Sequence, residues 1–246
     1  MPVTGAIFVA GAGGAIGRRL CLLLVAEGSQ VAGTTRSAEK ASALRSMGVE
    51  PVIVDVFDEQ ALREVVAAAR PKVVVHQLTD LPPGLDPARM AEAMVRNARI
   101  REVGTRNLVA AAVAAGARRM VAQSIAFAYA PGPMPYREDS PLNLAAPGDG
   151  GLTARAVASL EQQVLGAPLE GIVLRYGRFY GPGTGFDEPR RGAPLHVDAA
   201  ADAARRAVTR GAPGTYNVAE EDGMVSSLKA RDALGWRPDF RMDERR

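Results

Sequence analysis

Two spacings of apolar residues alternate along the chain. Short runs rich in β-branched residues, typical of strands buried on both faces, lie at residues 6–10, 31–34, 52–54, 73–75, 120–122, 172–174 and 215–218. Between them the apolar residues follow helical spacing, which predicts helices at 16–27, 39–47, 59–69, 87–115 (continuous or broken), 153–165, 197–210 and 226–234. Strands that alternate with helices predict an α/β fold, a doubly wound parallel sheet with right-handed crossovers.

Two segments interrupt this alternation. Residues 130–151 contain five prolines and four glycines, which predicts a long loop, and residues 177–194 form a second such segment. Loops of this kind are substrate walls in some proteins and plain surface excursions in others. No internal repeat or linker divides the 246 residues, so we expect a single domain over 1–246 with a reduced substrate-binding lobe within 177–246.

Composition narrows the class of protein. With 47% hydrophobic and 23% charged residues, the chain can bury a core. No apolar stretch approaches the roughly 18 residues of a membrane span, and residues 1–15 lack a secretory pattern, so we expect a cytoplasmic protein with no membrane partner. One cysteine and two histidines exclude structural zinc, and no metal site is expected. The 30 basic residues interleave with 27 acidic ones, which argues against a nucleic-acid partner.

A glycine-rich turn lies directly between the first expected strand and the first expected helix. Glycines there allow a tight turn, let a diphosphate approach the backbone and let the helix pack closely on the strand. The free N–H groups and positive dipole end of the helix then stabilise the anion. The predicted diphosphate-binding residues are Gly11, Gly13, Gly14, Ala15, Ile16, Gly17 and Arg18.

The spacing Gly11, Gly14, Gly17 resembles the short-chain dehydrogenase/reductase superfamily, in its extended and atypical branch of NAD-dependent epimerase/dehydratase-like proteins. Further segments are similar to family motifs, namely Asp55-Val56, GTRNL at 104–108, YGPG at 180–183, HVD at 196–198 and LGWRP at 234–238. The resemblance implies a Rossmann-like sheet, a nicotinamide cofactor and contacts of Asp55 and Val56 with adenine. We add Leu78 and Thr79, after the fourth expected strand, to the cofactor-binding set.

The end of the second expected strand bears on which nicotinamide cofactor binds. An NAD-binding protein places a carboxylate there against the ribose 2′-hydroxyl, and this chain has Thr35, Arg36 and Ser37 instead. Thr35 and Ser37 can donate hydrogen bonds, and Arg36, with Arg18, can neutralise a 2′-phosphate. We therefore expect NADP rather than NAD, unless Arg36 simply points into solvent.

The family's catalytic pair is missing from the sequence. Family reductases use a tyrosine followed four residues later by a lysine, whose ammonium lowers the phenol pKa. None of the five tyrosines has a lysine at that distance. Alignment of Glu161 with the glutamate that follows the motif places Thr153 at the tyrosine position and Val157 at the lysine position.

Other side chains are therefore candidates for the catalytic role, and we expect Ser124, Tyr129 and Tyr180 to donate protons. Counting from Tyr129 selects Ile125 instead of Ser124, and Thr153 and Arg155 are local replacements. His196 is a candidate base or a structural residue, and His76 is expected to be a core residue near the cofactor. Arg175 and Arg178 either hold an anionic substrate or form surface ion pairs.

These observations predict an NADP(H)-dependent oxidoreductase that acts on a small carbonyl compound or enone, with hydride from the nicotinamide. The short segments after Tyr180 and Val218 leave little room for a nucleotide-sugar and favour a small or flat aromatic substrate. The alternatives are a non-catalytic dinucleotide-binding sensor or scaffold, and a non-redox cyclase, dehydratase or isomerase. The sequence itself does not reveal the oligomeric state, and the resemblance implies a homodimer through residues 87–115 and 153–165.

Overall fold

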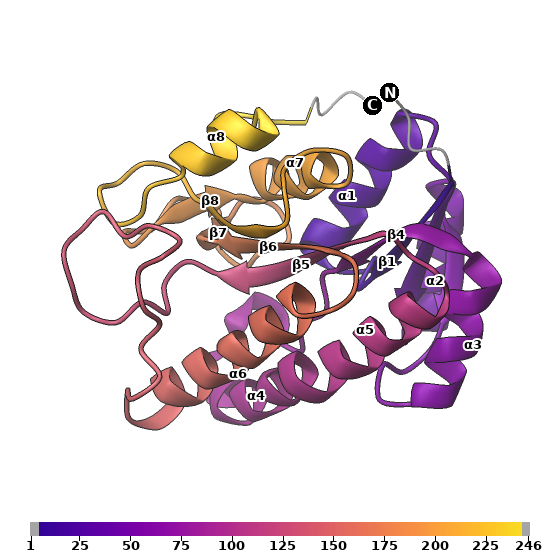
Figure 1. The fold of residues 1–246 in the computed structure, drawn as a ribbon, viewed down its shortest axis with the longest axis horizontal. Coiled ribbons are helices and arrows are strands. Elements are labelled where there is room, and N and C mark those ends of the chain that lie inside the picture. Colours follow the sequence, from indigo (N-terminus) through magenta and orange to yellow (C-terminus); the bar gives the residue numbers. More distant parts are fainter. Residues whose placement is uncertain (1–4, 243–246) are drawn as a thin grey trace.

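A computed structural model describes residues 5–242 of the chain, and it confirms the doubly wound α/β architecture (Figure 1). Seven parallel strands form one sheet in the order β3-β2-β1-β4-β5-β6-β9. They are β1 Ala6–Ala10, β2 Val31–Thr35, β3 Glu50–Ile53, β4 Pro71–His76, β5 Arg119–Ile125, β6 Glu170–Tyr176 and β9 Gly214–Val218. The order reverses between β1 and β4, and ligands of such sheets bind at the strand ends beside this reversal.

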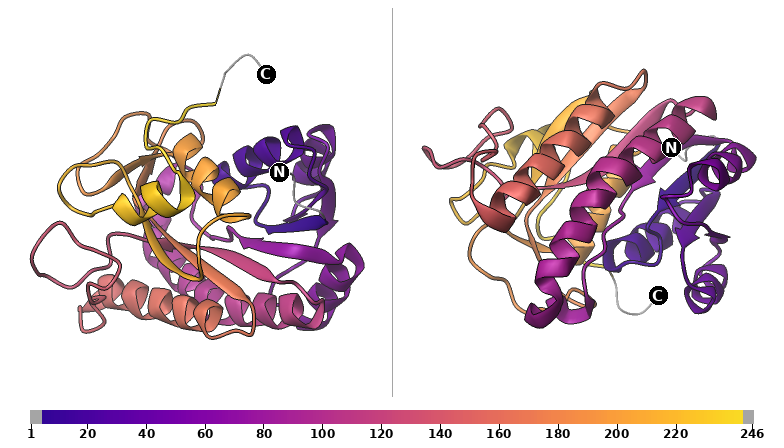
Figure 2. Two further views of the ribbon diagram at one scale, coloured as in Figure 1. Left: turned by 45° about the horizontal axis from the view of Figure 1, so that its top comes forward. Right: turned by 90° about the horizontal axis from the view of Figure 1, so that it is seen from below.

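Helices cover both faces of the sheet (Figure 2). Packed on one face are α1 Ala15–Ala26, α2 Ala38–Ser46, α7 Val197–Ala207 and α8 Leu228–Leu234. The other face is covered by α3 Glu59–Ala69, α4 Pro87–Arg99, α5 Thr105–Ala114 and α6 Gly148–Leu165. Neighbouring residues of β1 point to opposite faces, since Val9 packs with the first layer and Phe8 with the second, and both are fully buried.

The expected helix 87–115 is broken. A π-helical turn, Ile100–Gly104, separates α4 from α5, and the two helices continue nearly in line along α6 (Figure 1). Such turns insert a residue into the helical hydrogen-bond ladder and occur frequently at functional sites. Here the turn carries Arg101, which is buried.

Two expectations about loops were wrong in part. Helix α6 begins at Gly148, inside the segment 130–151, and the glycine at 151 is required because a Cβ there would lie 1.8 Å from the Ala146 carbonyl oxygen. The segment 177–194 contains a parallel two-stranded ribbon of β7 Arg178–Tyr180 and β8 Pro194–His196. Three-residue strands are too short to leave a periodic pattern in the sequence.

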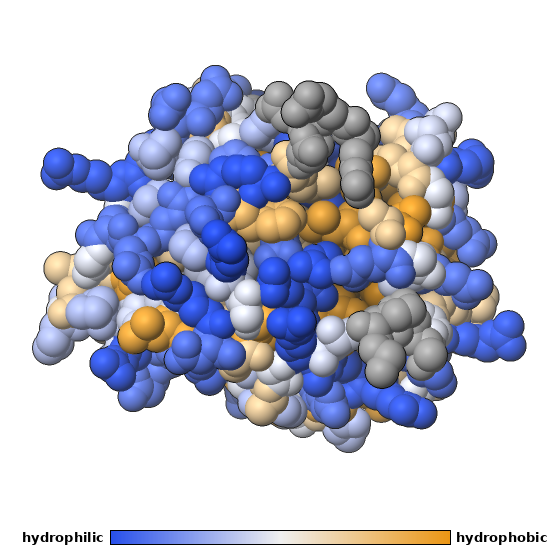
Figure 3. Space-filling model, turned by 90° about the horizontal axis from the view of Figure 1, so that it is seen from above, coloured by the Kyte–Doolittle hydropathy of each residue, from blue (hydrophilic) through white to orange (hydrophobic). Residues whose placement is uncertain are grey.

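The proline-rich loop between β5 and α6 is fastened to β9. The backbone N–H of Asn217 donates to the Glu138 carboxylate at 2.8 Å, and the Tyr136 N–H donates to the Met224 carbonyl at 2.9 Å. These bonds hold the loop beside the β7–β8 ribbon at the carboxyl end of the sheet (Figure 1). Hydrophilic side chains predominate in the left half of the molecular face shown in Figure 3, with smaller apolar areas among them. No helix within residues 5–242 is long and apolar enough to span a membrane.

Candidate functional site

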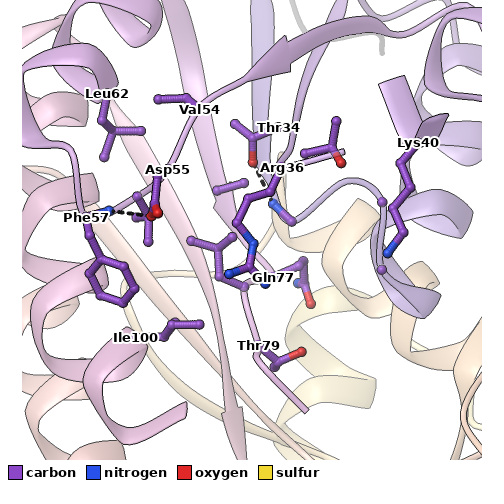
Figure 4. A pocket seen from close by; sticks show the side chains of 17 residues that line it. Thr34, Arg36, Lys40, Val54, Asp55, Phe57, Leu62, Gln77, Thr79 and Ile100 are labelled. Carbon is purple, nitrogen blue, oxygen red and sulfur yellow. Dashed lines mark hydrogen bonds between the residues drawn. The ribbon is translucent and has the colours of Figure 1, made fainter. Parts of the chain in front are cut away.

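A pocket lies at the carboxyl ends of β1 to β4, beside the reversal of strand order (Figure 4). Four successive loops supply its walls. Its lining residues include Gly11, Gly13 and Gly14 after β1, Thr35, Arg36 and Lys40 from β2 and α2, Asp55, Val56 and Phe57 after β3, and Gln77, Leu78 and Thr79 after β4. The carboxyl edge of a parallel sheet brings these distant segments into one concave surface.

The glycine-rich turn after β1 is shaped by close backbone contacts. Gly11 has φ of +89°, and a Cβ there would lie 2.6 Å from the Gln77 carbonyl oxygen. A Cβ on Gly17 would lie 2.1 Å from the Gly11 carbonyl oxygen, so helix α1 packs on the turn only with glycine at this position. The Gly11 N–H donates to the Thr34 hydroxyl at 3.0 Å, which fixes the turn against β2. Both glycines are therefore required by the local backbone geometry.

The amino end of α1 faces this turn without a side-chain cap. Its N-cap residue, Gly14, has extended backbone angles, and the first helical turn contains no acidic residue. Uncapped N–H groups and the positive end of the helix dipole favour an anion. A glycine-lined cradle at the amino end of a helix fits the diphosphate of a dinucleotide.

The structure brings together nine of the fourteen predicted cofactor residues as pocket-lining residues: Gly11, Gly13, Gly14, Thr35, Arg36, Asp55, Val56, Leu78 and Thr79. The other five lie nearby in different roles. Ala15, Ile16 and Gly17 form the start of α1, and Ser37 caps α2 by accepting a hydrogen bond from the Lys40 N–H. Arg18 lines a neighbouring groove with His196 and Arg241. Contact of these residues with a cofactor stays a prediction.

The segment that leaves β2 and the helix that follows it supply two cations to the pocket wall, Arg36 and Lys40 (Figure 4). Arg36 is 61% exposed and forms an ion pair with Asp80 at 3.5 Å, and Asp80 also pairs with Arg96 at 3.3 Å. Lys40 of α2 lies over the glycine turn, with its Cδ 3.2 Å from the position of a Cβ on Gly13. Sequence reasoning missed Lys40, although its place three residues after the Ser37 cap was a usable signal.

Gln77 is an unpartnered polar side chain in the pocket wall. It is 5% exposed, and neither its amide nitrogen nor its amide oxygen has a hydrogen-bond partner among the described residues. The nearby Tyr176 phenol donates instead to the Ala200 carbonyl at 3.1 Å. A buried amide without partners costs free energy, so the site fits a ligand that brings polar groups to this wall. A nicotinamide dinucleotide is such a ligand.

Ser124 lies inside a buried polar cluster. Its hydroxyl donates to Glu161 Oε1 at 2.7 Å. The same carboxylate accepts two hydrogen bonds from Arg175, at 2.8 and 2.7 Å, in a bidentate ion pair. All three residues are buried, so the hydroxyl and both charges find their partners within the protein.

The two candidate tyrosines also have internal partners. The Tyr129 hydroxyl donates to Asn217 Oδ1 at 2.5 Å and accepts from Arg175 at 2.9 Å. Burial raises the pKa of Tyr129, although the Arg175 charge opposes this rise. The Tyr180 hydroxyl donates to Glu220 at 2.8 Å, and burial together with that carboxylate raises the pKa of Tyr180 to about 12. Proton donation by Ser124, Tyr129 or Tyr180 stays a prediction.

Helix α6 offers no acid or ammonium at the positions aligned with the family's catalytic pair. Val157 is fully buried in apolar contact with Ile125, Ala128 and Ala154. Arg155 donates to the Leu144 carbonyl at 2.9 Å and so holds the preceding loop. Apolar side chains therefore occupy the place of the family's catalytic lysine.

Both histidines have structural partners. His76 Nδ1 accepts from the Leu78 N–H at 3.2 Å, which leaves Nε2 to donate to the Thr105 hydroxyl at 3.0 Å. Burial, with the charge of Arg101, lowers the pKa of His76 to about 4, so the ring is neutral near pH 7. His196 caps α7 by accepting from the Asp198 N–H.

Arg101, on the π-helical turn, is a residue that sequence reasoning missed. Its side chain is 9% exposed and has no ion pair or hydrogen bond with the described residues. Burial lowers the pKa of its guanidinium to about 10. Its neighbour Ile100 lines the pocket, so a buried positive charge lies next to the pocket wall.

Comparison with known proteins places this geometry in a family. The model of the NAD dependent epimerase/dehydratase family matches residues 7–211. The chain belongs to this family. The epimerase/dehydratase match includes the glycine turn, the pocket and the buried Ser124 cluster.

A curated relative of the chain is named 3-diazoavenalumate denitrifying reductase, from Streptomyces sp.. The alignment is 243 residues long at 44% identity, and it covers 88% of this chain and 76% of the relative. Among solved structures, UDP-glucose 4-epimerase of Thermus thermophilus in complex with NAD has a TM-score of 0.75 at 21% identity, covering 96% of this chain and 95% of that one. UDP-glucuronic acid 4-epimerase of Bacillus cereus has a TM-score of 0.76 at 15% identity, with coverage of 96% and 95%. These likenesses in structure concern the fold.

Proposed function

We propose that the protein is an NADP(H)-dependent reductase of a small, flat aromatic substrate. The observation that carries the proposal is the wall at the end of β2, where Arg36 and Lys40 line the pocket and the segment that leaves β2 contributes no carboxylate to it. A ribose 2′-phosphate is neutralised by cations, whereas a ribose 2′-hydroxyl is bound by a carboxylate. The 44% identity to a relative named a reductase supports the redox assignment.

The residues that would hold the cofactor come from four loops of the pocket. The glycine turn at Gly13 and Gly14 would hold the diphosphate, Asp55 and Val56 would border the adenine, and the Gln77 amide would bind a polar group of the ligand. When bound, the nicotinamide supplies a hydride. The chain itself orients the ligand and supplies the buried, largely apolar wall at Val157 and Ile125.

The absence of the catalytic pair bears on the substrate. A carbonyl that accepts hydride becomes an alkoxide, which requires a proton from the protein or from water. When an aryl diazonium is reduced by hydride, a C–H bond forms at the ring carbon, the C–N bond breaks and dinitrogen leaves. No alkoxide forms, so no phenol and ammonium pair is needed. Val157 at the lysine position and the name of the diazo relative both favour this second substrate class.

A carbonyl compound or an enone is the second candidate substrate. Its proton would come from Ser124, Tyr129, Tyr180 or water. In the structure all three side chains already donate to Glu161, Asn217 and Glu220 respectively. A protonation step through any of them first breaks an internal hydrogen bond, which makes the carbonyl the less favoured substrate.

The test combines binding and turnover. Calorimetry measures the dissociation constants of NADPH and NADH, and loss of NADPH absorbance is then followed with an aryl diazonium salt and with aldehydes, quinones and enones, each against a protein-free control. We expect NADPH to bind more tightly and the diazonium to give the fastest turnover. NADPH carrying deuterium at C4 should transfer it to the ring carbon. NADPH binding without turnover of any compound would favour a cofactor sensor, and no binding of either nucleotide would overturn the proposal.

A further inference from the structure

Two loops continue the pocket edge beyond the cofactor residues. The pocket is lined by the loops after β1 to β4, and β5 and β6 lie next to β4 in the sheet. The chain segments that leave β5 and β6 therefore border the next part of the same edge, where the substrate of a dinucleotide-dependent protein binds. Phe127 lies two residues after β5, and Arg178 lies two residues after β6.

Arg178 carries a charge that the described residues do not neutralise. Its guanidinium carbon lies 4.3 Å from the centre of the Phe127 ring, and the side chain has no ion pair or hydrogen bond within residues 5–242. Arg175, three residues earlier, is fully engaged with Glu161. Stacking on an aromatic ring leaves the N–H donors of a guanidinium free in the plane of the group.

A second unpaired guanidinium lies close by. Arg190 stands 3.5 Å over the Phe186 ring and has no ion pair with the described residues. Burial lowers the pKa of Arg178, and the charge of Arg190 lowers it further. The Asp222 carboxylate of this region accepts instead from the N–H groups of Gly192 and Ala193, at 2.9 and 2.8 Å. Arg178 and Arg190, neither of which has an ion pair within residues 5–242, together favour the binding of an anion.

The backbone holds Arg178 in place without help from an acid. Its N–H donates to the Ala193 carbonyl at 2.7 Å within the β7–β8 ribbon. Gly192 has φ of +95°, and a Cβ there would approach Arg178 Nε to 3.2 Å and the Met224 sulfur to 3.6 Å. Glycine at 192 thus leaves space for the side chains of Arg178 and Met224.

We propose that Arg178 and Arg190 bind the carboxylate of the substrate, which makes the substrate an aromatic acid. The planar fork of Arg178 matches a carboxylate in two parallel hydrogen bonds, and Arg190 supplies the second charge. Phe127 and Met224, beside the guanidinium, provide apolar contact for the ring of the acid. The carboxylate anchors the ring at the edge of β5 and β6, next to the cofactor pocket. This inference rests on the proposed function and specifies its substrate.

The test uses 2-naphthoate as the probe and its uncharged amide, 2-naphthamide, as the matched ligand. Calorimetry is run on the full chain saturated with NADP. We expect naphthoate to bind at least 10-fold more tightly than naphthamide. Arg178→Met should weaken naphthoate about 10-fold or more and leave naphthamide within about twofold, since each tenfold change corresponds to about 1.4 kcal/mol. Arg190→Met should give a smaller loss, and Arg178→Lys should restore part of the affinity.

The control variant is Arg191→Met, an exposed arginine next to Arg190, and it should bind naphthoate as the unchanged protein does. Equal binding of naphthoate and naphthamide, or an Arg178→Met protein with unchanged naphthoate affinity, would overturn the proposal. Displacement of naphthoate by equimolar inorganic phosphate would overturn the choice of a carboxylate. If NADP binds and naphthoate does not, only this inference fails. If naphthoate binds through Arg178 and neither nucleotide binds, only the proposed function fails.

Discussion

The Ser124 hydroxyl donates to Glu161 at 2.7 Å, beneath the bidentate Arg175–Glu161 ion pair. This bond joins the end of β5 to the middle of α6. Removal of one partner from a buried ion-pair cluster leaves a charge less well solvated. The hydroxyl therefore contributes to stability whatever its part in proton transfer.

Ser124→Ala should lower the free energy of unfolding by about 1.5–3 kcal/mol, the range for a hydrogen bond to a charged group. Urea denaturation measures this change. Ser46→Ala, at the exposed end of α2, is the control and should stay within about 0.5 kcal/mol of the unchanged protein. With an aryl diazonium substrate, turnover per folded Ser124→Ala molecule should be retained. A loss of turnover above 100-fold in a folded variant would instead support Ser124 as the proton donor.

Arg36→Ala should weaken NADPH about 10-fold or more and change NADH by about twofold or less, because the lost charge faces only a 2′-phosphate. Lys40→Met should act in the same direction. Arg45→Ala, an exposed arginine at the end of α2, serves as the control for general surface charge. Fluorescence titration gives the dissociation constants. Equal losses for both nucleotides would refute the assignment of a 2′-phosphate to this wall.

His76 should make the fold sensitive to acid. Its pKa is about 4 in the folded protein because burial disfavours the charged ring, whereas its unfolded value is about 6.5. The unfolded state therefore binds the proton first, and stability present above pH 6.5 is lost as the pH falls towards 4. The expected slope is up to about 1.4 kcal/mol per pH unit.

The control for this pH dependence of stability is the variant His76→Gln, which keeps a hydrogen-bond acceptor. His196 titrates in both proteins, so the difference between their urea midpoints from pH 7 to 4 isolates His76. Parallel pH profiles for the two proteins would contradict the pKa assigned to the ring.

Arg101→Met should stabilise the protein in the absence of ligands by about 1–3 kcal/mol, because it removes a buried charge that has no partner in the described structure and fills the same space. It should also raise the pKa of His76, which the Arg101 charge lowers. Arg106→Met, an exposed change on α5, is the control. A drop in thermal midpoint in Arg101→Met alone would show that the guanidinium has a stabilising partner.

The fold and the glycine turn could be predicted from sequence because both depend on local signals. Strand runs, helical spacing and the glycines at 11, 14 and 17 lie within short segments. The start of α6 was misplaced since three glycines at 148, 150 and 151 indicated a loop, whereas the close approach of Ala146 requires one of them. That contact is visible only in three dimensions.

The side chains of the site were harder to assign, because their partners lie far away along the chain. Arg175 and Arg178 are equivalent in the sequence, yet one is neutralised by Glu161 and the other lies unpaired over Phe127. Ser124 and Glu161 are 37 residues apart, and no spacing rule connects them. Gln77 and Arg101 were missed because the burial of a polar group against neighbours from other elements leaves no periodic signal.

Asp80 bridges Arg36 and Arg96 at the mouth of the pocket. A phosphate that binds Arg36 therefore replaces an anion already present, and only the difference between the two pairings counts toward nucleotide affinity. The exchange also breaks the Arg36–Asp80 ion pair, which links the segment after β2 to the segment after β4. If Arg36 binds a 2′-phosphate as proposed, the choice between the two pyridine nucleotides is coupled to this ion pair, and a nucleotide without the extra phosphate leaves it intact.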